Sequence, residues 1–106
     1  MFRILITIAL AFIALPAWAY TPEEWDRCQG VGTGAVLSVE ARIAYCTHLI
    51  QSGQLTTADL SAAYNNRGNA YRTQGLTDQA IADHTQAIAL NPNDAVPYRN
   101  RGNVRR

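Results

Sequence analysis

Apolar residues recur along most of the chain at the spacing of a helix face. Between Ser38 and Ser52, Ile43, Cys46 and Leu49 lie three positions apart, so a helix would place all three on one side. No segment alternates apolar and polar positions with strand-forming side chains, and we therefore predict no β-sheet. The pattern predicts an all-α fold with helices over residues 22–29, 39–51, 57–74, 78–90 and 96–106.

Capping and helix-breaking residues set the expected ends of these helices. Thr21 precedes Pro22 and Glu24, which is the arrangement of a capping box with proline in the first helical turn. Thr77 is predicted to cap the fourth helix, because a threonine hydroxyl can accept an unpaired N–H of the first turn. Pro92 cannot continue that helix and is expected to separate it from the fifth.

Residues 1–19 have the pattern of a secretory signal peptide. Arg3 gives a basic start, a mainly apolar run covers residues 4–15, and small residues, Ala17 and Ala19, precede a cleavage point before Tyr20. The apolar run is shorter than the ~20 residues that span a bilayer. We expect an exported chain that works as residues 20–106; the alternative is a leader that stays uncleaved and anchors the protein in the membrane.

Charge and composition exclude two classes of protein. The formal net charge is +1, and from Tyr20 onward eight arginines face eight carboxylates, with no lysine. A nucleic-acid binder depends on uncompensated positive charge, so no nucleic-acid partner is expected. An acidic disordered tail is also excluded, because 48% of the residues are hydrophobic.

Cys28 and Cys46 are the only cysteines. An even number of cysteines in a small exported chain favours a disulfide between them, which the loop-entropy model values at about 3 kcal/mol. The rival interpretation is a zinc site completed by His48 and His84, but the short paired spacings usual for such sites are missing. A catalytic thiol would need a free sulfur beside a base. We predict the disulfide and no metal or cofactor.

No catalytic constellation stands out. His48, His84 and the carboxylates are the candidates for acid–base chemistry, but no Ser-His-Asp set, phosphate-binding loop or cofactor motif accompanies them. Two helix pairs also leave little room for a pocket of ligand size. We therefore predict that the chain is not an enzyme.

An internal repeat is the most informative feature. Residues 64–69 (YNNRGN) return as residues 98–103 (YRNRGN), 34 positions later and with five of six identical. A period of 34 with two helices per unit is typical of tetratricopeptide repeats. Residues 61–106 resemble that family, although His84 stands where an aromatic residue is usual and Arg67 where leucine is common. The positions that match the family pattern are Tyr64, Gly68, Tyr71, Ala80, Ala87 and Pro92.

Residues 20–60 resemble the family less closely. Residues 43–50 align with residues 81–88 at an offset of 38, with matches that include Ile43 and Thr47. This segment is expected to be a degenerate first helix pair, joined by its disulfide, and residues 61–106 a full repeat followed by a shortened one. The resemblance implies a short α-solenoid of about two and a half antiparallel helix pairs.

The resemblance also implies a function. Small exported bacterial proteins of this family are expected in the periplasm, where the front helices would bind a protein or peptide segment on a concave face. Asparagine amides can bond an extended backbone, and arginines can hold carboxylates. The alternatives are a structural adaptor anchored by its leader and a homodimer formed through the last helix. The groove residues that the resemblance implies are Asn65, Asn69, Arg72, Arg99 and Asn103.

Overall fold

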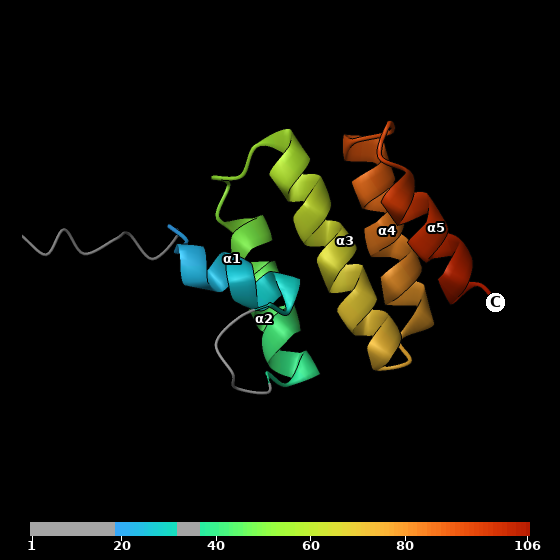
Figure 1. Ribbon diagram of the computed structural model, residues 1–106, viewed down its shortest axis with the longest axis horizontal. Coiled ribbons are helices and arrows are strands. Elements are labelled where there is room, and N and C mark those ends of the chain that lie inside the picture. The colour runs from blue at the N-terminus through green and yellow to red at the C-terminus, as the bar shows by residue number, and fades with distance from the viewer. Residues whose placement is uncertain (1–18, 32–36) are drawn as a thin grey trace, which may run out of the picture.

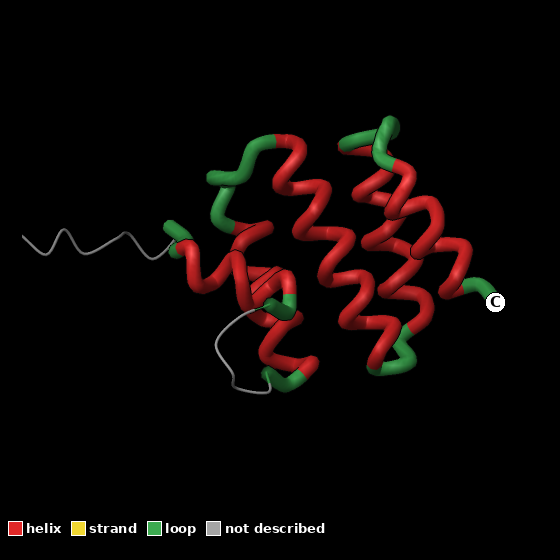
Figure 2. The backbone as a smooth tube through the Cα atoms, in the orientation of Figure 1, coloured by secondary structure: helices red, strands yellow, loops and turns green. Residues whose placement is uncertain are grey.

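The computed structural model describes residues 19–31 and 37–106, and all regular structure in these ranges is helical. The loops that join α2 to α3, α3 to α4 and α4 to α5 are short (Figure 2). The prediction of an all-α fold is therefore confirmed. In chain order the helices are α1 (Pro22–Gln29), α2 (Val39–Gln51), α3 (Thr57–Thr73), α4 (Thr77–Leu90) and α5 (Ala95–Val104) (Figure 1).

Two sequence predictions concern residues outside these described ranges. The signal peptide expected over residues 1–19 lies, except for Ala19, outside the described residues, and so do residues 32–36 of the loop expected between the first two helices. Within residues 19–31 and 37–106, no helix combines the length and the apolar character that crossing a membrane requires.

The helices are arranged as a stack. Each helix contacts the next in the chain, and the odd-numbered helices also contact one another, α1 with α3 and α3 with α5. Helices α1, α3 and α5 therefore form one layer, with α2 and α4 behind it. Figure 1 shows the progression from α1 at one end to α5 at the other. This is the arrangement of a short helical solenoid, as the repeat period predicts.

Polar side chains cap three of the helices, and the cap at Thr21 is the one that the sequence predicts. Thr21 Oγ1 accepts the N–H of Glu24 at 3.3 Å, and Glu24 Oε2 accepts the N–H of Thr21 at 2.7 Å, which completes a capping box. Ser38 and Thr56 each accept the N–H three residues further on, both at 3.1 Å. These contacts are local, so they can be read from the sequence.

Two other helix starts differ from the prediction. Thr77 does not cap α4: it is already helical, and Leu76 occupies the cap position without a side-chain hydrogen bond. The link of residues 74–76 is short enough to bring the chain into the helix one residue early. Helix α5 also begins one residue early, because Asp94 Oδ1 accepts the N–H of Val96 at 3.0 Å. It ends at residue 104 rather than at 106.

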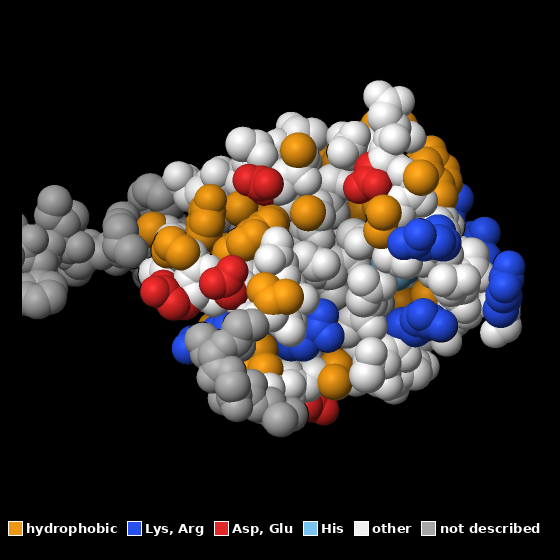
Figure 3. Space-filling model, viewed as in Figure 1, with side chains coloured by type: hydrophobic (Ala, Val, Ile, Leu, Met, Phe, Trp, Pro, Cys, Tyr) orange, Lys and Arg blue, Asp and Glu red, His pale blue; other side chains and the backbone are white. Residues whose placement is uncertain are grey.

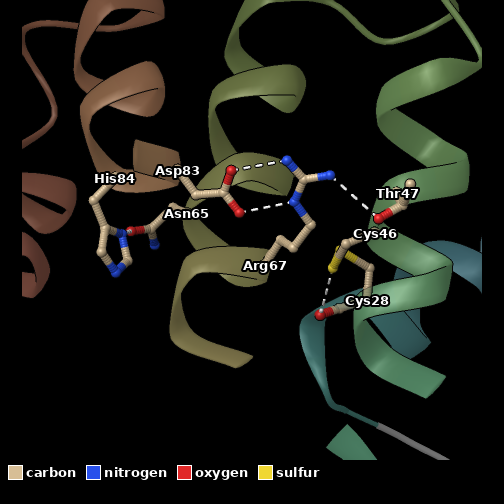
Figure 4. Close-up of polar contacts among 7 residues, drawn as sticks. All are labelled: Cys28, Cys46, Thr47, Asn65, Arg67, Asp83 and His84. Atoms are coloured by element: carbon tan, nitrogen blue, oxygen red, sulfur yellow. Dashed lines mark hydrogen bonds and ion pairs between the residues drawn. A yellow bond between two sulfur atoms is a disulfide. The ribbon is translucent and has the colours of Figure 1, made fainter. Parts of the chain in front are cut away.

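A buried cluster joins the first three helices. Cys28, Cys46, Leu49 and Ala63 are fully buried and in mutual contact. The structure joins the two cysteines in a disulfide, with their Cα atoms 4.7 Å apart (Figure 4). The disulfide ties α1 to α2 at the centre of this cluster. Partly buried apolar side chains surround it: Tyr20, Trp25, Tyr45, Ile50 and Leu55.

Small residues let α3 and α4 approach closely. Ala70 on α3 and Ala80 and Ala87 on α4 are fully buried. A Cβ atom on Gly68 would lie 2.8 Å from the ring of His84, so this position of α3 has no space for a side chain. Glycine at position 68 is therefore required by the contact with α4.

Candidate interaction surface

Arg67 links three helices. From α3, its Nε and Nη2 donate to the carboxylate of Asp83 on α4 at 2.7 and 2.8 Å, and its Nη1 donates to Thr47 Oγ1 on α2 at 3.2 Å (Figure 4). The guanidinium also lies 5.4 Å from the ring centre of Tyr64 and 5.6 Å from that of Tyr71. The hydrogen bond to Asp83 raises the pKa of Arg67 against the opposing effect of burial. The two parallel hydrogen bonds make this a bidentate, charge-assisted pair between α3 and α4.

His84 lies at the contact of α3, α4 and α5. Its Nδ1 is 2.9 Å from Asn65 Oδ1, and the same oxygen accepts from Asn100 Nδ2 at 3.1 Å. Because Oδ1 is an acceptor, His84 carries its proton on Nδ1. Its Nε2 is buried and, among the described residues, lacks a hydrogen-bond partner.

Burial is the main reason that the pKa of His84 lies below its ordinary value. The charges of Arg72 and Arg101 lower the pKa further, whereas Asp83 opposes the shift. A proton on Nε2 would add a buried donor without an acceptor, which is costly. His84 is therefore held in the neutral form and acts as a packing residue with one polar contact.

The five residues expected in a groove have different environments. Asn65 is partly buried and its Oδ1 is engaged by His84 and Asn100, so it joins helices. Arg72 and Arg99 are exposed, and Asn69 and Asn103 are partly exposed. We call the last four residues the α3/α5 face.

The two helices of the α3/α5 face lie beside each other. Asn69 and Arg72 are three positions apart on α3, and Arg99 and Asn103 four apart on α5, so each pair lies on one side of its helix. The hydrogen bond between Asn65 and Asn100 joins the two helices. The structure thus places two exposed arginines and two amides on neighbouring helices of one layer.

The residues of the zinc alternative have other partners in the structure. The two cysteines are bonded to each other, and His48 Nδ1 lies 2.9 Å from Glu24 Oε1. In residues 19–31 and 37–106, no three His, Cys, Asp or Glu side chains are grouped so that they could hold a metal ion.

Sequence reasoning missed the pairing of Arg67 with Asp83. The signal available was that Arg67 departs from the leucine common at its position, since a buried arginine requires a partner. The partner itself, 16 residues away on another helix, becomes visible only when the helices are packed.

Comparison with known proteins gives one result at the level of families. Residues 61–94 match the family model of the tetratricopeptide repeat. The match begins within α3, at residue 61, and covers the rest of that helix, α4 and the turn before α5. No solved structure matches the chain.

Proposed function

Because residues 61–94 match the tetratricopeptide repeat, we propose that the chain is a protein-interaction module whose α3/α5 face binds a peptide segment that carries a carboxylate. Repeats of this family serve in general as interaction modules rather than enzymes. The observation that supports the peptide site is the pair of exposed arginines, Arg72 and Arg99, on adjacent helices. Among the described residues neither pairs with a carboxylate of the chain.

The chemistry of the α3/α5 face suits an extended peptide. The amides of Asn69 and Asn103 can donate to and accept from a peptide backbone, and an arginine can hold a carboxylate through two parallel hydrogen bonds. Figure 3 shows several arginine side chains toward the α5 end of the visible face. An anionic ligand would therefore approach a positively charged region.

The test compares two forms of one acidic peptide, one with a free C-terminal carboxylate and one amidated, by isothermal titration calorimetry. The free-acid form is expected to bind more tightly, and the double variant Arg72→Ala/Arg99→Ala to lose about tenfold or more in affinity for it. Arg105→Ala removes a charge outside the α3/α5 face and serves as the control. Equal affinity of the double variant and the unchanged protein would refute the peptide site.

The place of action is proposed from the leader pattern alone. Cleavage before Tyr20 would release residues 20–106 into an oxidising compartment, the periplasm in a Gram-negative bacterium, where the bond between Cys28 and Cys46 is stable. Mass spectrometry of the protein from its native host should find a chain that begins at Tyr20. A chain that retains residues 1–19 would contradict cleavage and favour an anchored adaptor.

A further inference from the structure

Helix α5 repeats the side of α3 that faces α4. Tyr64, Arg67 and Gly68 have their equivalents 34 positions later in Tyr98, Arg101 and Gly102, and we call these three residues of α5 the edge face. The contact with the preceding helix is repeated too. Arg67 Nη1 donates to Thr47 on α2 at 3.2 Å, and Arg101 Nη1 donates to Thr85 on α4 at 3.3 Å.

The two arginines also meet their tyrosines in the same way. Arg67 lies 5.4 Å from the ring centre of Tyr64, and Arg101 lies 5.8 Å from that of Tyr98. The contact of α5 with the helix before it, and the contact between its own arginine and tyrosine, thus reproduce those of α3.

The contacts that α3 makes with α4, the helix that follows it, have no counterpart on α5 among the described residues. Asp83 of α4 holds Arg67 with two hydrogen bonds, and the ring of His84 fills the space in front of Gly68. In the described part of the chain no carboxylate pairs with Arg101. A Cβ built on Gly102 meets nothing within 4 Å, and Tyr98 is 43% exposed.

We propose that the edge face of α5 binds an acidic α-helix of a partner protein. A carboxylate of this helix would accept hydrogen bonds from Arg101, as Asp83 does from Arg67. The next residue, a bulky one, would pack against Gly102, as His84 packs against Gly68. The proposal concerns a surface other than the α3/α5 face. It stands independently of the peptide site.

The positive charge at the α5 end favours an acidic partner. Helix α5 carries Arg99 and Arg101, and Arg105 and Arg106 follow it. Its nearest carboxylate, Asp94, caps the helix through its contact with Val96. A carboxylate on the incoming helix would therefore gain a charge-assisted bidentate contact that this end of the molecule does not supply.

A second copy of the chain is a poorer occupant. Two edge faces placed against each other would bring their arginines together, at a cost in repulsion. The Asp83-His84 pair of a second copy is also inaccessible, because these side chains are only 5% and 0% exposed. The homodimer through the last helix that the sequence suggested is therefore disfavoured at this surface.

The probe for the edge face is a fluorescently labelled peptide with the sequence of residues 76–91, which contains Asp83 and His84. An isolated helix of this length is marginal in water. The peptide therefore carries a side-chain bridge between positions 82 and 86, whose side chains are exposed in α4. Its binding to the full chain is measured by fluorescence anisotropy.

We expect the peptide to bind and its Asp83→Asn form to bind about tenfold more weakly. The protein variant Arg101→Gln should bind both peptides with the same weak affinity, because the group that distinguishes them is gone. Gly102→Leu, which fills the notch but leaves Arg101 in place, should weaken binding about tenfold or more. Arg106→Gln removes the same charge from the same end and should leave the affinity unchanged.

Three results would overturn the proposal. The bridged peptide fails to bind; both peptides bind equally to the unchanged protein; or Arg101→Gln still distinguishes them, which would mean that the peptide displaces α4 from Arg67. Sedimentation of the protein alone adds a fourth: self-association that Arg101→Gln abolishes would assign the edge face to a second copy. Circular dichroism confirms that each variant keeps its helices.

Discussion

At the scale of single residues, Gly68 and Gly102 stand at equivalent positions in different surroundings. The repeat makes them look alike in sequence, yet a Cβ on Gly68 would meet the His84 ring at 2.8 Å while one on Gly102 would meet nothing within 4 Å. Both glycines lie inside helices, where alanine is intrinsically favoured by about 1 kcal/mol. The difference between the two sites is therefore entirely one of packing.

The two alanine substitutions should accordingly have opposite effects. Gly68→Ala is expected to lower the free energy of unfolding by about 1–3 kcal/mol, because the buried ring must move. Gly102→Ala is expected to raise it by about 0.5–1 kcal/mol through helix propensity. Urea denaturation measures both. A Gly68→Ala protein as stable as the Gly102→Ala protein would show that His84 can move without cost.

The pKa of His84 predicts a dependence of stability on pH. Because burial lowers this pKa in the folded chain, the unfolded chain binds the proton more readily. The stability linked to His84 is therefore complete above the unfolded pKa of about 6.5 and is lost as the pH falls below it. The charges of Arg72 and Arg101 add to this lowering of the His84 pKa, and the charge of Asp83 opposes it.

Unfolding midpoints in urea, measured at about pH 7.5 and about pH 5.5, test this expectation. The unchanged protein should lose stability at the lower pH, and His84→Phe, which keeps an aromatic ring at the position, should lose less. His48 and its partner Glu24 remain in both proteins, so their contribution cancels in the comparison. Equal losses in the two proteins would mean that the pKa of His84 is the same in the folded and the unfolded chain.

The residue scale is also where the sequence was least informative. Arg67 and His84 could be recognised as departures from the family pattern, but not their partners, Asp83 and Asn65. Both pairings cross between helices, and they depend on the rotation of one helix against another. Asn65 shows the same limit: its place on the helix was predicted, but not that Asn100 and His84 would occupy its oxygen.

At the scale of the elements, helix positions followed closely from local chemistry. Thr21, Ser38 and Thr56 each cap through a bond to a residue three positions on, so the signal and the structure lie within one turn. Thr77 failed as a cap because the geometry of the preceding turn decides which residue enters the helix first. Local rules therefore give the existence of a helix more securely than its first residue.

The bond between α1 and α2 should be a large part of the stability of this end of the stack. Replacing both Cys28 and Cys46 by alanine is expected to cost about 3 kcal/mol, because the unfolded chain regains the freedom of the closed loop. Chemical denaturation with and without a reducing agent measures the effect. The reductant should lower the midpoint of the unchanged protein and leave that of the double variant where it is; an unchanged midpoint in both would show that the bond contributes little.

At the scale of the whole molecule, a balanced total charge hides two unlike ends. Glu23 and Asp26 are exposed on α1, whereas Arg99, Arg105 and Arg106 are exposed at the α5 end. Figure 3 shows Asp and Glu side chains over the α1 region, where arginine side chains are visible as well, and several arginine side chains over the α5 region. Composition alone excluded a uniformly basic surface. It could not reveal this separation, because the position of each charged side chain depends on the place of its helix in the stack.

The stack itself was predictable because the 34-residue period carries information from one unit to the next. The family match to residues 61–94 confirms that prediction. The two binding surfaces depend on what α5 leaves uncovered. That is a property of the assembled helices, and no single segment of the sequence shows it.

The contacts of Arg67 with both helix pairs affect how the molecule unfolds. The Arg67 side chain bonds Thr47 of the first helix pair and Asp83 of the second. Part of the stabilisation from these hydrogen bonds therefore acts between the two pairs and is lost if either pair unfolds. In a linear array, strong junctions relative to the units make neighbours unfold together. The first two helix pairs should therefore behave as a single cooperative block, with fraying confined to the final helix.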